Sequence, residues 1–330
     1  MKALYALIAV AAMAAAAFHA SEYNALRTTF GIVLPYAAFA TFLAGFTYKV
    51  VRWAWSPVPF HIPTTCGQQR SLSWIKPARL ENPSTRLGVV ARMALEVLLF
   101  RSLFRNTRAE LREGPHLTYA ENKFLWLAAL AFHWSLLIII ARHIRFFILP
   151  IPPVLYALDA FDGFFQVAEP TLYVTDVVVL ASLLYLLGRR LWDPQIRYVS
   201  LLTDYFALFL LLGLASSGIL MRYFVKVDLV AVKRLALGLV SFSPVVPQGV
   251  APLFFVHLTL LNALAAYFPF SKLMHMGGIF LSPTRNLANN SRMKRHVNPW
   301  NYPVPVHTYQ EWEDEFREKI RVAGLPLERE

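Results

Sequence analysis

Cysteine is almost absent from this chain, since Cys66 is the single one among 330 residues. One thiol cannot form an internal disulfide, an iron–sulfur cluster or a cysteine-based zinc site, because each needs several thiolates. Charged residues are also scarce, at 16% against about 25% in soluble domains. No Walker A run, Gly-x-Gly-x-x-Gly or Gly-x-Ser-x-Gly occurs, so no nucleotide or hydrolase site is indicated and no catalytic residue is predicted.

Apolar residues make up 57% of the chain and gather in long blocks that favour a membrane protein. A helix needs roughly 20 mainly apolar residues to cross a bilayer. The sequence predicts an all-α membrane protein with about six transmembrane helices. The first candidate also fits a cleaved signal peptide, because Lys2 precedes it and small residues end it. The candidate windows are Leu4–Ala20, Phe30–Val51, Phe124–Leu149, Thr171–Leu187, Leu201–Met221 and Ala251–Phe270.

Charge placement predicts the topology. Leu87–Phe104 is apolar but carries Arg92, Glu96 and Arg101 at roughly helical spacing, which predicts an interfacial helix. The net charge is +12, and Lys and Arg gather between the second and third windows and after the last. Basic loops stay cytoplasmic, so we expect a multi-pass protein of the inner (cytoplasmic) membrane with a cytoplasmic C-terminus. The expected regions are two N-terminal transmembrane helices (1–51), a basic cytoplasmic loop with the interfacial helix (52–122), a four-helix domain (123–278) and a cytoplasmic docking tail (279–330).

Four histidines fall on the third and last predicted spans. Ionisable residues inside a bilayer are costly and mark functional sites. His133 and His143 are 10 residues apart and His257 and His275 are 18 apart, which gives about 15 and 27 Å of helical rise. Because the two helices cross in opposite directions, we expect His133 level with His275 near the cytoplasm, and His143 level with His257 near the outside. A kink at Pro269 within the last helix would absorb part of the mismatch.

Neutral imidazoles that face each other across a bundle hold a planar metal macrocycle by its two axial faces. The two pairs therefore predict two haem groups of b type, since no Cys-x-x-Cys-His motif for covalent attachment occurs. A metal-free role for the histidines, in proton relay or helix contact, stays open. Arg142 and Arg145 flank His143 and are candidates to bind haem propionates or a quinone head group, with snorkelling to the interface as the alternative.

The histidine separations resemble those of the gamma subunit of respiratory nitrate reductase, over roughly residues 120–280. Three segments further resemble the DsrM family, membrane subunits of the Dsr complex linked to dissimilatory sulfite reductase. They start at Pro57 (PVPFHIPTTCGQQ), Trp74 (WIKPARLENP) and His275 (HMGGIFLSPTRNLANN).

This resemblance implies a dihaem cytochrome b that links a pool of menaquinone, or another quinone, to a cytoplasmic iron–sulfur subunit. That partner would be DsrK-like, in a Dsr complex with further subunits that serves sulfur metabolism and sulfite reduction. The resemblance also implies haem ligation by His133 with His275 and by His143 with His257, and a quinone site near His143 and Arg142. No nucleic-acid partner is expected. Alternatives are a cytochrome b subunit of another quinone-linked oxidoreductase, of formate dehydrogenase or heterodisulfide reductase type, and a haem-free scaffold or transporter.

Two cytoplasmic segments are expected to contact the partner. Residues 52–86 are rich in proline and basic residues and contain Cys66, and Tyr309–Val322 carries apolar side chains every fourth residue. The spacing in Tyr309–Val322 predicts a short amphipathic helix. The alternative is that this segment is a solvated tail without a partner contact. Residues 285–308 have several Asn and Pro and no apolar period, so we expect them to run extended.

Overall fold

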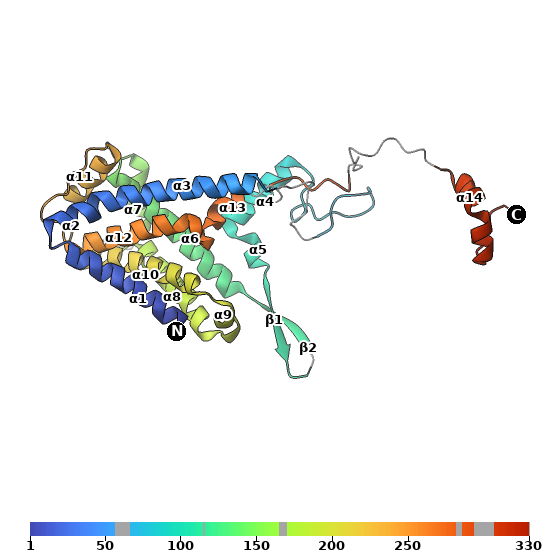
Figure 1. The fold of residues 1–330 in the computed structure, drawn as a ribbon, viewed down its shortest axis with the longest axis horizontal. Helices are drawn as coiled ribbons and strands as arrows, with labels where there is room; N and C mark the ends of the chain where they lie inside the picture. Colours follow the sequence, from blue (N-terminus) through green and yellow to red (C-terminus); the bar gives the residue numbers. More distant parts are fainter. Residues whose placement is uncertain (57–66, 115, 165–169, 282–285, 294–306, 330) are drawn as a thin grey trace.

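The computed structural model describes residues 1–56, 67–114, 116–164, 170–281, 286–293 and 307–329. Long helices lie side by side in a bundle, with shorter elements at its two ends (Figure 1). In a bilayer a helix satisfies its own backbone hydrogen bonds, which is why apolar segments of this length fold as helices. The long helices are α1 (Lys2–Ala20), α3 (Leu34–Ala54), α6 (Lys123–His143), α8 (Val174–Trp192), α10 (Leu202–Tyr223) and α12 (Pro252–Tyr267).

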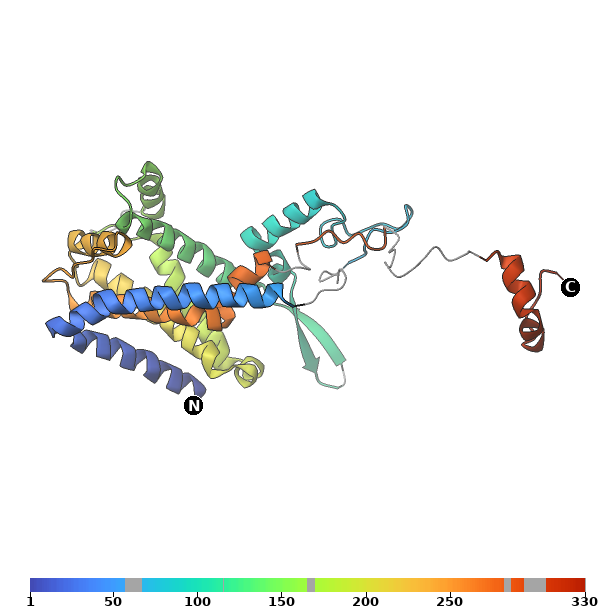
Figure 2. The ribbon, with the colours of Figure 1, turned by 45° about the horizontal axis from the view of Figure 1, so that its top comes forward.

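The shorter elements gather at the two ends of the bundle. One end holds α2, α7 and α11, and the other holds α4, α5, α13 and a β-hairpin, as both ribbon views show (Figures 1 and 2). The helix α9 follows α8 directly. Their bounds are α2 (Asn24–Thr28), α4 (Arg86–Leu99), α5 (Arg101–Phe104), β1 (Thr107–Arg112), β2 (His116–Glu121), α7 (Pro153–Asp162), α9 (Pro194–Val199), α11 (Leu229–Val240), α13 (His275–Leu281) and α14 (Tyr309–Val322).

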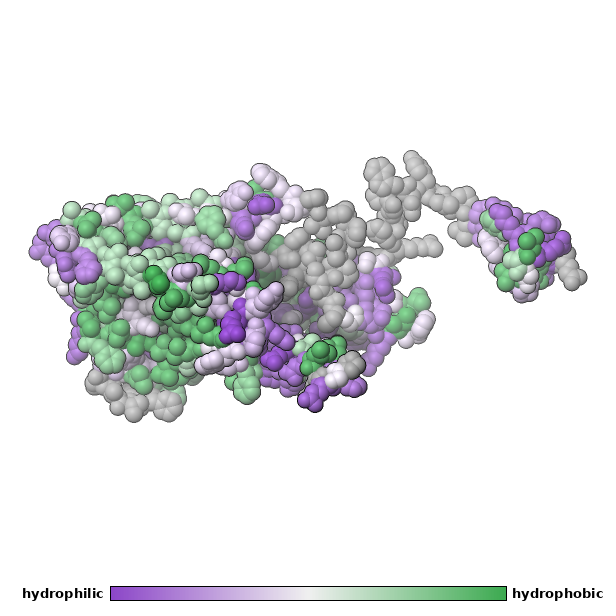
Figure 3. Space-filling model, turned by 60° about the horizontal axis from the view of Figure 1, so that its bottom comes forward, coloured by the Kyte–Doolittle hydropathy of each residue, from purple (hydrophilic) through white to green (hydrophobic). Residues whose placement is uncertain are grey.

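The predicted helical membrane fold is confirmed. Among the described residues, five helical stretches are long and apolar enough to cross a membrane: Lys2–Ala20, Asn24–Ala54, Lys123–Phe146, Leu202–Tyr223 and Pro252–Phe270. The predicted fourth span corresponds to α8, which has 19 residues, packs against α6 and α10, and carries Asp176, Arg189 and Arg190. The surface over the bundle is largely hydrophobic (Figure 3). The chain is therefore a multi-pass membrane protein.

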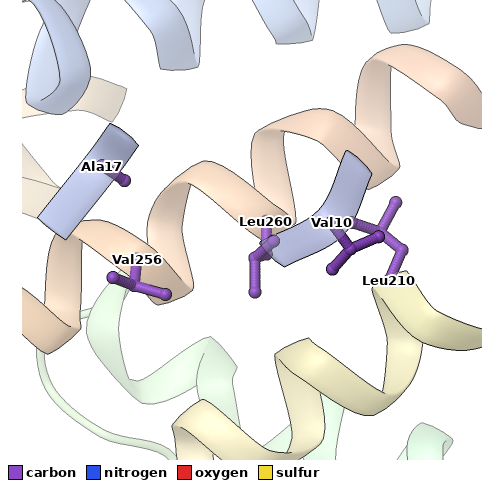
Figure 4. Packing of buried hydrophobic residues seen from close by; sticks show 5 residues of the cluster. All are labelled: Val10, Ala17, Leu210, Val256 and Leu260. Carbon is purple, nitrogen blue, oxygen red and sulfur yellow. The ribbon is translucent and has the colours of Figure 1, made fainter. Parts of the chain in front are cut away.

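The buried core of the bundle joins α1 to α10 and α12. Val10 and Ala17 of α1 pack with Leu210 of α10 and with Val256 and Leu260 of α12 (Figure 4). The first predicted span is thus an integral part of the helix packing in this structure.

The end of the last predicted span differs from the expected kinked helix. The α-helix stops at Tyr267, a 3-10 turn covers Phe268–Phe270, and Ser271 is extended at φ −118° and ψ 176°. Proline removes a backbone donor and clashes with the preceding turn, so Pro269 ends α12 instead of bending it. His275 consequently begins a separate helix, α13, and the expectation of one helix carrying both His257 and His275 is wrong.

Two local features of the loop before α6 differ from the sequence-based expectation. The predicted interfacial helix over Leu87–Phe104 is divided into α4 and α5 at Phe100. Its charged side faces the protein, since Arg92 and Glu96 are each 6% exposed while Leu87 is 79% exposed. An antiparallel hairpin of β1 and β2 follows, which the all-helical prediction did not include.

The predicted C-terminal amphipathic helix is confirmed as α14. Thr308 caps its start by accepting a hydrogen bond from the Glu311 amide at 3.2 Å, and the Glu311 carboxylate accepts one from the Thr308 amide at 2.8 Å, the capping-box arrangement. Cys66 lies outside the described residues, as do residues 285 and 294–306 of the predicted extended segment.

Candidate functional site

The structure brings the four histidines together two by two. His133 of α6 lies beside His275 of α13, with ring centroids 5.9 Å apart and ring planes at 80°. His143, at the end of α6, lies beside His257 of α12, with centroids 6.4 Å apart and planes at 12°. Ten residues of α6 therefore separate the two pairs, about 15 Å along a helix. The break at Ser271 allows His275 to reach His133 despite its longer separation from His257 in sequence.

One ring nitrogen of each histidine forms a hydrogen bond with a neighbouring group. The Nδ1 atoms of His133 and His143 lie 2.7 Å from the carbonyl oxygens of Ala129 and Ile139. The Nδ1 atom of His275 lies 2.8 Å from the Lys272 carbonyl. A carbonyl only accepts, so each Nδ1 carries the proton and donates it. Each Nε2 of these three neutral imidazoles then keeps its lone pair, as a metal ligand requires.

His257 reaches the same state through a side chain. Its Nδ1 lies 2.9 Å from the hydroxyl oxygen of Ser217, and that hydroxyl donates its own proton to the Leu214 carbonyl at 3.0 Å. The hydroxyl is therefore the acceptor for His257, which again leaves Nε2 as the free ligand atom. Gly218 lets this ring approach α10, because a Cβ at this position would lie 3.3 Å from His257 Cε1.

The donor set fits a haem held by its two axial faces. Among the described residues no three His, Cys, Asp or Glu side chains gather at one point, so each pair offers two protein ligands. A metal bonded to one nitrogen of each imidazole at about 2.0–2.1 Å separates the ring centres by roughly 6 Å, and both pairs have this spacing. His143 and His275 are also exposed residues.

Aromatic rings surround His133 more closely than His143. The rings of Phe100 and Phe132 both lie 4.9 Å from the His133 ring, edge to face. Phe146 lies 5.8 Å from His143 with a tilt of 55°. The two histidines of α6 therefore sit in different surroundings.

A buried ionic network lies directly beside the His143–His257 pair. Arg142, the neighbour of His143, forms ion pairs with Asp162 of α7 and Asp176 of α8, each at 3.1 Å. The Tyr223 hydroxyl of α10 donates to Asp176 at 2.8 Å. Asp162 also accepts the Thr175 amide at 2.9 Å and its hydroxyl at 2.6 Å. The network thus joins four helices at this end of the bundle and pairs buried charges that would otherwise be costly.

The same network includes cation–π contacts of two arginines with the ring of Tyr173. Arg142 and Arg222 lie on Tyr173, with their guanidinium carbons 3.7 and 3.9 Å from its ring centroid. Arg145 pairs with Asp159. Both arginines that the sequence offered as cofactor ligands, Arg142 and Arg145, thus contact carboxylates of this chain. A haem propionate or quinone head group would share them with these carboxylates, and their cofactor role stays a prediction.

Sequence reasoning identified the four histidines but not the groups that orient them. Ser217 is a small residue that carries no sequence signal for this role, because its bond to His257 depends on how α10 rotates against α12. Phe100 gave no sequence signal, because its contact with His133 depends on the division between α4 and α5.

These features define a class: a multi-pass helical membrane protein with two facing histidine pairs inside its bundle. The family model of the nitrate reductase gamma subunit matches residues 87–295, which include all four histidines, and the chain belongs to this family. The resemblance to that gamma subunit is thereby confirmed.

Two relatives share most of the chain. It is 45% identical over 278 residues to the Hdr-like menaquinol oxidoreductase cytochrome b-like subunit of Archaeoglobus fulgidus, which covers 82% of this chain and 83% of the relative. It is 42% identical over 301 residues to the protein of the same name in Archaeoglobus profundus, covering 88% and 87%. Neither name refers to Dsr, so the likeness to DsrM stays a prediction.

Proposed function

We propose that this chain is a dihaem cytochrome b subunit that transfers electrons between menaquinol and a cytoplasmic partner subunit. The observation that carries the proposal is the presence of two histidine pairs whose Nε2 atoms are free and whose rings are 5.9 and 6.4 Å apart. The relatives named as cytochrome b-like subunits of menaquinol oxidoreductases support it. When bound, haem supplies one-electron chemistry that the protein tunes through its ligands and surroundings.

Each part of the chain has a role in this proposal. His133 with His275, and His143 with His257, hold the two haems, while the Nδ1 hydrogen bonds fix the ring tautomers. The quinol site lies near His143 and the Arg142 network, at the end of the bundle that also holds α7 and α11. The partner binds at the opposite end, where the β-hairpin and α13, which begins at His275, lie (Figure 1).

Optical spectroscopy of the purified chain tests the haem assignment. Reduced-minus-oxidised spectra should show b-type haem at two per chain. His133→Ala and His275→Ala should each remove the same haem, and His143→Ala and His257→Ala should each remove the other. His116→Ala, in the exposed β2 strand, is the matched control and should keep both. Absence of b-haem in the native protein would refute the proposal, and favour the haem-free scaffold or transporter.

The finer assignment is to a Dsr complex with a DsrK-like iron–sulfur partner. The segments starting at Trp74 and His275 and the near-absence of cysteine support it, because the chain cannot hold its own iron–sulfur cluster. Affinity purification of the tagged chain from its native membrane, followed by identification of the bound proteins, tests this assignment. An iron–sulfur protein of the Dsr type is expected. Recovery of a different redox partner would assign the chain to another quinone-linked oxidoreductase.

A further inference from the structure

Phe100 stands at the joint between α4 and α5 in a backbone conformation that bulky residues rarely adopt. Its φ and ψ are 50° and 47°, in the left-handed region. Among the described residues, Phe100 and Phe242 are the non-glycine positions with positive φ, and Phe242 is 83% exposed. Such backbone strain costs of order 1–3 kcal/mol and persists where the surroundings impose it.

Helix α6 and the joint itself impose this conformation. The indole nitrogen of Trp126 donates to the Leu99 carbonyl at 2.7 Å, and that of Trp134 donates to the Leu98 carbonyl at 3.0 Å. On the other side of Phe100, the Glu96 carboxylate accepts the Ser102 amide at 3.0 Å. The last residues of α4 are thus attached to the same helix that carries His133.

The result is a direct contact with a predicted haem ligand. The Phe100 ring stands at 82° to the His133 ring, 4.9 Å between centroids, and Phe132 meets His133 at 78° and the same distance. Both histidines of α6 have an Nδ1 bond to a backbone carbonyl, and at His133 the two phenyl rings restrict rotation of the imidazole further. The plane of His133 lies at 80° to that of His275, whereas the planes of His143 and His257 differ by 12°.

We propose that Phe100 is a positioning residue that holds the His133 ring nearly perpendicular to the His275 ring. This inference rests on the proposed haem ligation by these two histidines. The angle between two axial imidazole planes changes the splitting of the iron d orbitals. Perpendicular planes give a strongly anisotropic low-spin ferric signal in electron paramagnetic resonance, and parallel planes give a rhombic one. The two haems of this chain should therefore give one signal of each kind.

Phe100→Leu tests the inference in the full-length, haem-loaded protein. In this variant His133 keeps its Nδ1 bond to the Ala129 carbonyl and its contact with Phe132 but loses the restraint from the Phe100 ring, so the anisotropic signal should shift towards the rhombic type. The midpoint potential of the same haem should shift, while the signal and potential of the other haem stay unchanged. Phe100→Tyr keeps the ring and should retain the native spectrum.

Phe242→Leu is the matched control, because Phe242 is the other phenylalanine with positive φ among the described residues and its ring stacks on Tyr36. It should leave both signals unchanged. If Phe100→Leu fails to fold, Phe100→Gly removes the ring while relieving the positive φ and should give the same spectral change. Both haems bound with unaltered signals in Phe100→Leu or Phe100→Gly would overturn the inference alone. A native protein without haem would instead overturn the proposed function.

Discussion

At the scale of single residues, Ser217 orients the candidate haem ligand His257 through its hydroxyl. The Nδ1 atoms of the other three histidines bond to backbone carbonyls instead. Ser217→Ala removes the acceptor for His257 Nδ1 and leaves a buried donor unpaired. Loss of a group that orients a ligand typically costs about 10–100-fold in affinity, so the haem at His143–His257 should bind at least about tenfold more weakly. Haem titration into the haem-depleted protein measures this.

The adjacent Ser216→Ala is the control for Ser217→Ala, because Ser216 is less buried than Ser217 and Ser217 provides the hydroxyl that meets His257. It should leave both affinities near the native value. Equal weakening in the two variants would show that crowding on α10, and not the hydrogen bond, determines binding.

Glu81 connects the basic loop to α5 through ion pairs with Arg101 and Arg105. These pairs require an ionised Glu81 and therefore depend on pH. Burial opposes ionisation of Glu81, but its hydrogen bond and ion pair with Arg101 at 2.7 Å, and its pair with Arg105, outweigh this and lower its pKa from the usual 4.5. A carboxyl with a lowered folded-state pKa stabilises the fold above its unfolded pKa, and the effect fades as pH falls through the folded value.

Glu81→Gln should therefore lower the thermal unfolding midpoint at pH 7 and have little effect once the pH lies well below 4.5. Unfolding scans across this range measure the difference. Glu121→Gln is the control, since Glu121 is 76% exposed and lies 3.9 Å from Lys123. Surface pairs of this kind contribute little, so a similar loss there would contradict a specific role for Glu81.

At the scale of helices, the break after α12 is the element that positions His275. Pro269 is fully buried and abuts Gly45, where an added Cβ would lie 2.8 Å from the proline ring. Pro269→Ala restores the missing amide, so the helix should continue through Ser271 and turn His275 away from His133. We expect loss of the haem proposed at His133–His275, measured by haem content and spectra.

Pro252→Ala is the control for the break, because Pro252 occupies the first turn of α12, where proline is tolerated. It should retain two haems. If Pro269→Ala also retains both, His275 is positioned by contacts of α13 and not by the break.

The β-hairpin carries an apolar face without a partner in the described part of the chain. Leu111 and Leu117 are opposite each other in the register and are 77% and 58% exposed, and Tyr119 shares their face. An isolated two-stranded hairpin is marginally stable, which suits a surface covered by another subunit. Leu117→Lys should weaken binding of the partner about tenfold or more in a pull-down titration, without haem loss. Thr118→Lys, on the other face, should bind normally.

The long helices and the four histidines could be predicted from the sequence. The breaks between helices and the rotation of the helices against one another could not. Apolar length and the absence of internal charge determine α1, α6 and α10, and the four-residue apolar spacing determines α14. The divisions at Phe100 and Ser271 are set by tertiary contacts, namely the indole bonds from α6 and the packing of Pro269 on Gly45. The pairing of the histidines could be predicted from their expected depths in the membrane. The bond between Ser217 and His257 depends on how α10 and α12 are rotated against each other, which the periodicity of the sequence does not determine.

At the scale of the whole molecule, the basic residues of the loop before α6 and of the C-terminal region predict that both lie on the cytoplasmic side of the membrane. In a Cys66→Ser background, Gln248→Cys should react with a membrane-impermeant thiol reagent in intact cells. Glu315→Cys on α14 should react only after the membrane is opened. The reverse pattern would place both the proposed quinol site and the proposed partner surface on the opposite sides of the membrane.

Helix α6 contributes one histidine to each pair, and the two opposing histidines are separated by an irregular segment. The distance between the two predicted metal positions is therefore determined by ten residues of one rigid helix. An insertion of a single residue between His133 and His143 would rotate one of them by about 100° and destroy one site. An insertion near Ser271 could be accommodated by the extended backbone. Insertions between His133 and His143 should thus abolish a site, whereas insertions near Ser271 should be tolerated.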